Sequence, residues 1–480
     1  MFQNRTLKFV LFVVLTASLL LSACQPAPAV PAVEEPAPPA AEEPAAPVAE
    51  EPAAEEPEVP AVEEPAAPAK PSGRLVFMVQ QANQDVFEQT VLDEFLAEYP
   101  DITIEWINHP PAEVANQVAL AIQGGVGAPD LAVSETRSIS RLVGLGGLVD
   151  LTAKVQPYLD RLNRPMMELA GADGKYYGVT WDIGPVVTFY RRDIFRAAGL
   201  PDDPESVSEL ISTWDKFLET CTIIKDETGL PCFALNRANN YGDYFYNMLW
   251  SQGLGFTDAD GRVAINSPQH VATLEKLGEF WAADVVSDSL EWTDGWYAEL
   301  NASIDDPNVK PVATIVIASW MGSFLKSWIA PDQAGNWGVA YMPAFTEGGV
   351  RSANQGGSAF FIPEQSTNKE AAWAFIEFMI LNDENHLEIF EYSDYFPALE
   401  SIYGAPLFSQ PDPYFADQPT RLIYAEAARQ IPLSTLYGVY AIPMSAAATT
   451  AVQQFAMGLM SAQAALDEAA NTIRLETGLE

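Results

Sequence analysis

A tryptophan and an aspartate next to a Gly-Pro interruption between two predicted strands are the first residues whose types suggest a binding site. Trp181 and Asp182 follow a short run of strand type and precede the breaker Gly184-Pro185, within the stretch 174–201. A flat aromatic ring offers contact area, and a carboxylate accepts hydrogen bonds. The pair therefore suggests a ligand-binding wall or a hinge, and the alternative is a core tryptophan beside a capping aspartate.

Motifs for nucleophilic, metal or phosphate chemistry are missing from the sequence. There is no GxSxG, HExxH or phosphate-binding loop, no CxxC and no Cys–His pair, and the three histidines are scattered. Acidic pairs are common in a chain with 65 Asp and Glu, so Glu135 and Asp182 alone do not predict a glycosidase. We therefore predict a binding protein without a metal or cofactor rather than an enzyme.

Polar residues follow the predicted strands of the first half. Strand-type runs at 74–79, 102–107 and 130–133 alternate with helical spacing at 86–99 and 113–123. This alternation predicts an α/β fold with a parallel sheet covered on both faces, and such sheets bind ligands at the carboxyl ends of their strands. The hydrogen-bonding residues expected to converge there are Gln80, Gln81, Asn108, Glu135 and Thr136.

The second half adds aromatic, amide and glycine candidates. They are Asn239 and Tyr241 at a predicted helix start, Trp296 with its neighbour Trp292 in a polar segment, Ser319 and Trp320 after a buried strand, and Gly357 in a Gly-Gly pair. Glycine permits close backbone approach, either to a ligand or between two parts of the chain. Helical spacing instead predicts that Trp214, Trp250 and Trp281 lie in the core.

These residue types suit a carbohydrate. Sugar rings present C–H faces that pack on flat aromatics, and hydroxyls that bond to Asn, Asp, Glu and Gln in a largely preformed cleft. The chain has 11 Trp and 17 Tyr, several of them at predicted strand ends. A phosphate or carboxylate ligand needs Arg or Lys, yet neither lies next to Trp181, Trp320 or Asn108, so a charged ligand fits less well. Arg137 and Arg237 are the nearest exceptions.

Length and charge limit the possible architecture and partners. A chain of 480 residues is too long for one typical core, so we expect at least two globular units. The net charge is −40, with only 25 Lys and Arg, which argues against a nucleic-acid partner.

Residues 1–24 have the layout of a secretory signal. Arg5 and Lys8 precede the apolar run 9–21, which is too short for a permanent membrane span, and Cys24 follows small residues. This pattern resembles the bacterial lipoprotein signal, whose cysteine is lipidated after cleavage. The resemblance implies an extracytoplasmic protein, attached to the outer face of the cell membrane through a lipid on Cys24 alone. The alternative is a plain signal peptide with an incidental cysteine.

Residues 25–72 are near-repeats of Pro, Ala, Val and Glu that cannot bury a core. Their prolines favour an extended conformation, which over this length reaches roughly 150 Å at about 3.1 Å per residue. We interpret the segment as a disordered tether, and a recognition segment for a partner is the alternative. The folded region is expected to begin near Gly73.

Two cysteines in the folded region suggest a disulfide. Cys221 and Cys232 lie eleven residues apart in a chain expected to be exported, where disulfides persist. A bond between them would close a small loop and stabilise the fold by about 3 kcal/mol.

Several longer stretches occur in a distinctive order. They are EYPDITIEW, GGVGAPDLAV, LGGLVDLTAKV, GKYYGVTWDIGPVVTFYRRDIFRAAGLP and STWDKFLETC, then VATIVIASWMGSF, NQGGSAFFIPEQSTNKEAAWAFIEFMI and AQAALDEAANTIRLE. In this order they resemble the family-1 extracellular solute-binding proteins of ABC importers, which serve sugars and oligosaccharides. The resemblance covers roughly residues 73–480.

The resemblance implies a two-lobed, periplasmic-binding-protein-like α/β fold, in which each lobe is a sheet flanked by helices and hinge crossovers join the lobes. The implied lobes are 73–183 with about 360–430, and 184–359 with about 431–480. Ile183-Gly184-Pro185 becomes the first hinge strand, and Tyr440 is similar in position to a ligand-wall aromatic. The implied protein is a monomer that captures a sugar between its lobes and delivers it to ABC importer permease subunits.

Three other interpretations stay open at this point. A binding protein for a non-sugar solute would share the fold, and a surface-anchored glycoside hydrolase would release new reducing ends from oligosaccharides. A scaffold lipoprotein would show no shift in melting temperature with any sugar.

Overall fold

The computed structural model describes residues 70–237, 243–287, 289–434 and 438–480. They belong to one compact unit that spans Pro68–Glu480. The expectations for Cys24, for residues 25–69 of the tether, and for Asn239 and Tyr241 lie outside the described residues. Within the described ranges, no helix combines the length and the apolar character needed to cross a membrane.

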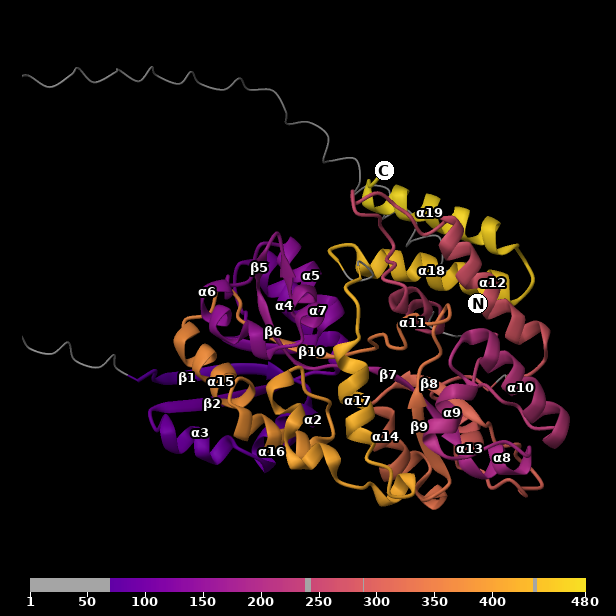
Figure 1. The fold of residues 1–480 in the computed structure, drawn as a ribbon. Coiled ribbons are helices and arrows are strands. Elements are labelled where there is room, and N and C mark those ends of the chain that lie inside the picture. The colour runs from indigo at the N-terminus through magenta and orange to yellow at the C-terminus, as the bar shows by residue number, and fades with distance from the viewer. Residues whose placement is uncertain (1–69, 238–242, 288, 435–437) are drawn as a thin grey trace, which may run out of the picture. The chain divides into compact units, whose positions relative to one another are not determined.

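A five-stranded sheet is built mainly from the first half of the folded region (Figure 1). Its order is β2 (Ile102–Asn108), β1 (Gly73–Val79), β3 (Leu131–Glu135), β10 (Ser358–Phe361) and β6 (Gly178–Asp182). β1 pairs in parallel with β2 and β3, which confirms the three predicted parallel strands. β10 returns from far along the chain and runs antiparallel to β3 and β6.

Helices cover both faces of this sheet, as predicted. On one face, α2 (Gln81–Gln89) and α15 (Lys369–Ile380) close an aromatic core with ring centroids 5.2 to 6.2 Å apart, made by Phe77, Phe87, Phe360 and Phe375. On the other face, α4 (Pro111–Gly124) and α5 (Thr136–Gly144) supply Val118 and Leu142. Burial of each such side chain stabilises the folded protein by about 1.5–3 kcal/mol.

The helix predicted over 86–99 is two helices in the structure. α2 ends at Gln89, and α3 begins at Leu92 and ends at Glu98. Between them, Thr90 leaves the helical conformation, and its Oγ1 donates to the Val86 carbonyl at 2.7 Å. A β-branched residue that bonds the preceding turn weakens helix continuation, so the break occurs here.

A three-stranded antiparallel sheet forms the second half, in the order β8 (Thr314–Ala318), β7 (Val186–Arg191) and β9 (Trp337–Tyr341). Every residue of β7 is buried, as the uncharged run 186–190 predicts, and the burial extends to Arg191 at its end. The surrounding helices are α8 (Arg192–Ala197), α9 (Pro204–Leu210), α10 (Trp214–Thr228), α11 (Asp243–Ser251), α12 (Pro268–Ala282), α13 (Asp294–Asn301), α18 (Ala441–Ala456) and α19 (Ala462–Thr477). Trp214, Trp250 and Trp281 are buried, which confirms their core assignment.

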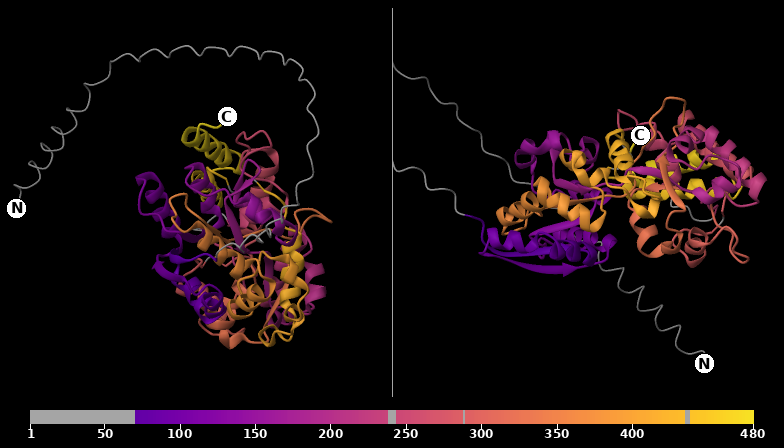
Figure 2. Two further views of the ribbon diagram at one scale, coloured as in Figure 1. Left: turned by 90° about the vertical axis from the view of Figure 1, so that its left-hand side faces the viewer. Right: turned by 60° about the horizontal axis from the view of Figure 1, so that its bottom comes forward.

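Figures 1 and 2 show the part with the five-stranded sheet beside the part with the three-stranded sheet. Two segments that connect the sheets lie against each other at Pro185 and Asn354. Gly184, between β6 and β7, donates its N–H to Asn354 Oδ1 at 2.9 Å, and its carbonyl accepts from Gln355 N at 2.9 Å. A Cβ at Gly184 would lie 2.0 Å from the Gln355 carbonyl oxygen, so the approach requires glycine. The chain therefore passes between the sheets through two paired segments.

Cys221, on α10, is bonded to Cys232 with an S–S distance of 2.07 Å, and both residues are buried. The bond joins α10 to the segment that precedes α11, and Cys232 continues into a backbone hydrogen bond with Thr314 of β8. The disulfide thus fixes a helix beside the three-stranded sheet.

Candidate ligand-binding site

A cavity of about 500 Å³ opens where the chain passes between the two sheets. It is lined by Glu135, Arg137, Asp243, Tyr246, Trp292, Trp320, Gln355, Gly356, Gly357, Ser445, Ala446 and Thr449. The volume is in the usual range for small-molecule sites. The lining comes from the end of β3 and the start of α5, the crossover before β10, the start of α11, the segment before α13, the end of β8 and the side of α18.

Two glycines let the crossover pass close to its neighbour. Gly356 and Gly357 have φ of +91° and +95°, a region that other residues rarely adopt. A Cβ on Gly357 would lie 2.7 Å from the Asp182 carbonyl oxygen, and the Gly357 carbonyl accepts from Thr136 N at 2.9 Å. Gly357 therefore joins the start of β10 to β6 and α5 while it lines the cavity.

An aromatic wall stands on one side of the cavity. Trp320 follows β8, and its Nε1 donates to the Gln355 carbonyl at 3.0 Å, which fixes the indole ring. Trp292 stacks on Trp320 with centroids 5.9 Å apart and an interplanar angle of 28°. Trp292 is 38% exposed and has φ of +62°, an unfavourable conformation for a bulky residue. Its ring is therefore held in the wall by the surrounding fold.

Carboxylate and amide groups line another part of the cavity. Gln355 Nε2 donates to Asp243 Oδ2 at 2.8 Å, and Asn247 Nδ2 donates to Gln355 Oε1 at 3.3 Å. Arg137 pairs with Glu135 at 2.5 Å. Burial raises the pKa of Asp243; the charge of Arg137 and the bond from Gln355 oppose that rise, and the charge of Glu135 adds to it. These groups form a connected acceptor-rich surface.

Hydroxyl groups connect α11 with α18 beside the cavity. Tyr246 donates its hydroxyl to the Ser445 carbonyl at 2.8 Å, and its oxygen lies 2.9 Å from Thr449 Oγ1. Ser445 and Thr449 are four residues apart and therefore lie on one face of α18. Within the described residues, no group of three or more His, Cys, Asp or Glu is arranged to hold a metal ion.

Three of the predicted site residues line the cavity together: Glu135, Trp320 and Gly357. Gln81 and Asn108 also lie together, since Asn108 Nδ2 donates to Gln81 Oε1 at 2.9 Å, but neither lines the cavity. Tyr440 is 39% exposed just before α18 and is likewise not in the lining.

Trp181 lies in the core and not in the cavity wall, which corrects the expected position. It is 1% exposed and packs against Phe87, Phe360 and Tyr395 with centroids 5.4 to 6.0 Å apart. Strand β6 directs its side chain into the aromatic core, because burying so large a ring is strongly favourable. The alternative reading of Trp181 as a core residue is the correct one.

Asp182 supports the crossover and does not line the cavity. Its Oδ1 accepts from Ser358 N at 2.8 Å, next to Gly357. Burial raises the pKa of Asp182 to about 7; the bond from Ser358 opposes this shift, and the charge of Glu135 adds to it.

Trp296 is also a core residue, 1% exposed, and it packs behind Trp292 with centroids 5.2 Å apart. Of the two tryptophans in this polar segment, Trp292 therefore lines the cavity and Trp296 does not. Helix α13 begins at Asp294, so Trp296 falls on its buried face with Leu300.

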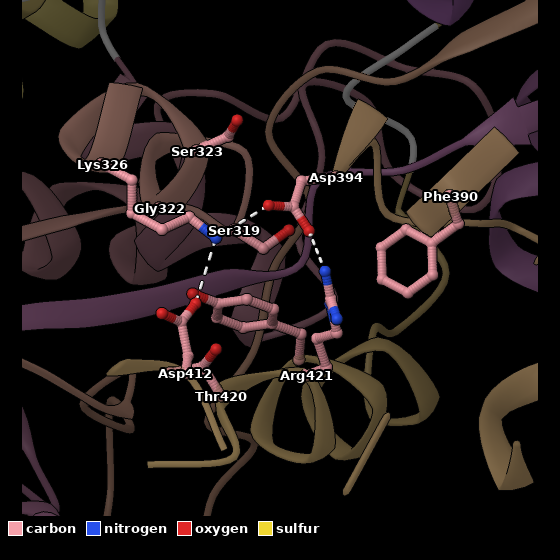
Figure 3. A pocket seen from close by; sticks show the side chains of 10 residues that line it. Ser319, Gly322, Ser323, Lys326, Phe390, Asp394, Asp412, Thr420 and Arg421 are labelled. Carbon is pink, nitrogen blue, oxygen red and sulfur yellow. Dashed lines mark hydrogen bonds and ion pairs between the residues drawn. The ribbon is translucent and has the colours of Figure 1, made fainter. Parts of the chain in front are cut away.

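Ser319 is buried and lines a separate void of about 10 Å³ (Figure 3). Beside that void, Lys326 Nζ lies 2.8 Å from Asp394 Oδ2 and 3.0 Å from Asp412 Oδ2, and Arg421 pairs with Asp394 at 2.6 Å. A void of this size has room for about one water molecule, so the cluster is a structural ion-pair network. The expected position of Ser319 in the ligand cavity is thus wrong.

Some lining residues were missed at the sequence level. Gln355 and Gly356 directly precede Gly357, so the same glycine motif could have indicated them. Ser445 and Thr449 lie in an alanine-rich helix with no local pattern that separates them from other small residues.

Comparison with known proteins shows the family of this chain. A family described as "Bacterial extracellular solute-binding protein" matches residues 90–416. The chain belongs to this family. It is 27% identical over 337 residues to the arabinooligosaccharide-binding protein of Halalkalibacterium halodurans, covering 69% of this chain and 72% of that protein. It is 25% identical over 364 residues to the lactose-binding protein of Rhizobium radiobacter, covering 74% and 82%.

The fold of this solute-binding protein is also that of solved structures. A crystal structure titled extracellular solute-binding protein family 1 superposes with a TM-score of 0.73 at 20% identity, covering 84% of this chain and 99% of that one. The two-lobed α/β fold implied by the sequence is therefore confirmed.

Replacing Gly357 by alanine should lower the free energy of unfolding by about 1–3 kcal/mol, because the new Cβ meets the Asp182 carbonyl at a positive φ. Urea unfolding measures the change. Gly404→Ala is the control, since nothing lies within 4 Å of its added Cβ. Equal stability of the two variants would contradict the assigned role of Gly357.

The raised pKa of Asp182 predicts a pH-dependent stability. A carboxyl whose pKa is about 7 when folded and 3.8 when unfolded binds more protons in the folded state between these values. The free energy of unfolding of the wild type should therefore fall as the pH rises from about 4 to 7, relative to Asp182→Asn. Denaturant unfolding across this pH range measures it, and parallel curves for the two proteins would refute the assignment.

Proposed function

We propose that this protein captures a sugar or oligosaccharide outside the cytoplasm and delivers it to the permease subunits of an ABC importer. The observation that carries the proposal is the cavity itself. It combines the stacked indoles of Trp292 and Trp320 with the carboxylate and amide groups of Asp243 and Gln355. Indoles accept the C–H face of a sugar ring, and the acceptor groups bond its hydroxyls.

The charges around the cavity favour a neutral ligand. Among the described residues of the lining, Arg137 is the single cation, and it is paired with Glu135. Asp243 adds a further acidic group. This surface has no excess of positive charge to bind a phosphate or carboxylate group, so the lining disfavours anionic ligands. The names of the arabinooligosaccharide- and lactose-binding relatives support the same class of ligand.

The proposed lobes follow the two sheets. The first contains the five-stranded sheet and the second contains the three-stranded sheet, with hinges at Ile183–Pro185 and around Gln355. Gln418 bonds the backbone of Val339 on β9 through both its amide atoms, at 2.9 and 2.7 Å. In this proposal, the segment after about residue 410, including α17 (Thr420–Arg429), therefore belongs with the second lobe and not with the first.

The proposal extends to the N-terminal region. Cys24 would carry the lipid that anchors the protein, and residues 25–72 would hold the folded monomer away from the outer face of the cell membrane. The layout of the signal and the proline-rich composition support this part.

A thermal-shift screen with arabino-, galacto- and malto-oligosaccharides tests the function. At least one series should raise the melting temperature, and Trp320→Ala should weaken the binding of that sugar by about tenfold or more. Tyr392→Ala, which removes a 57% exposed aromatic on another helix, serves as the matched control. Absence of any shift, or full affinity in Trp320→Ala, would contradict the proposal; new reducing ends would indicate a hydrolase instead.

Ligand should also close the hinge. A sugar that contacts both lobes binds the closed state better and shifts the population toward it. Small-angle scattering should then show a smaller radius of gyration with the bound sugar than without it. An unchanged radius at saturating sugar would argue against closure while leaving binding intact.

A further inference from the structure

A run of aromatic rings leads away from the cavity wall. Trp320, Phe324 and Trp328 are spaced four residues apart along α14 (Met321–Phe324) and the following π-helix η2 (Leu325–Ile329). The centroids of Trp320 and Phe324 are 5.5 Å apart, and those of Phe324 and Trp328 are 5.8 Å apart. Each ring therefore touches the next.

Aromatic residues of a second segment pack against the side of this run. Tyr297 lies 5.1 Å from Trp328 and 5.6 Å from Trp296, which in turn packs 5.2 Å from Trp292. Trp296 is buried, so it supports the rings from behind. We call the partly or well exposed members the aromatic strip: Trp292, Tyr297, Trp320, Phe324 and Trp328.

The strip begins in the cavity and ends on the protein surface. Trp292 and Trp320 line the cavity, whereas Trp328 lies outside the lining and is 50% exposed. A connected group of large aromatics facing solvent is unusual for a protein surface and commonly marks a binding site. Its continuity with the cavity indicates that both serve the same ligand.

Local backbone features at both ends strengthen this interpretation. Trp292 has φ of +62°, and Trp328 lies in a π-helix. Bulky residues at positive φ and π-helical turns are both energetically unfavourable, and they are concentrated at functional sites. Here the two features position the two most exposed rings of the strip.

We propose that the aromatic strip is an extended subsite, which holds the part of an oligosaccharide that projects from the cavity. The inference rests on the proposed sugar-binding function. Sugar units stacked on Trp320 would continue along Phe324 to Trp328 without leaving aromatic surface. The protein then binds longer oligosaccharides more tightly than short ones, because the sugar units that extend beyond the filled cavity gain contact with the aromatic strip.

Titration calorimetry with Trp328→Ala tests this subsite. In the sugar series that binds the wild type, the disaccharide and the hexasaccharide are compared. The variant should bind the hexasaccharide about 3- to 10-fold more weakly and should leave the disaccharide affinity unchanged. Trp328→Phe should keep most of the hexasaccharide affinity, and Tyr392→Ala should bind both sugars as the wild type does. Circular dichroism checks folding, and Trp328→Gln replaces any variant that fails to fold.

The outcomes separate this inference from the proposed function. If the wild type binds sugar and Trp328→Ala weakens both lengths equally or neither, the extended subsite is wrong and the function stands. If the wild type binds no member of any series, the function fails and the subsite fails with it. A loss confined to the hexasaccharide supports both.

Discussion

The close pairing of two chain crossovers is the constraint on which this structure depends. The Gly184 carbonyl accepts from Gln355 N, and the Gly184 N–H donates to the Asn354 side chain, in a space that excludes any side chain at Gly184. A Cβ at Gly357 would also lie too close to the Asp182 carbonyl oxygen, at 2.7 Å, and the Asp182 side chain accepts from Ser358 N. These contacts bring the end of the five-stranded sheet to the end of the three-stranded sheet. The ligand cavity lies where the two meet.

The pairing also sets which groups face the cavity. Trp320 is oriented by its bond to the Gln355 carbonyl, and the Gln355 side chain bonds Asp243. One residue of the crossover thus connects the aromatic wall to the polar wall. The aromatic wall and the polar wall are therefore held in a fixed relation to each other by Gln355.

Local patterns in the sequence predicted the elements better than their arrangement. The parallel strands, the core tryptophans of the helices and the role of Gly357 at a close approach follow from periodicity and glycine chemistry. The strand-end rule selected Glu135, which lines the cavity. It also selected Asn108, which lies on the edge strand β2 and does not line the cavity. The cavity lies beside the start of β10 instead, and the insertion of β10 next to β3 depends on pairing far along the chain, which a local pattern does not predict. The burial of Trp181 was equally beyond local pattern, since it depends on rings from three other elements.

The most direct test of this account is a crystal structure of the protein with a bound oligosaccharide. The account predicts a sugar ring stacked on Trp320, with hydroxyls bonded to Asp243 or Gln355 and the chain passing beside Gly356 and Gly357. A sugar bound elsewhere on the protein, with this cavity filled only by water, would contradict it.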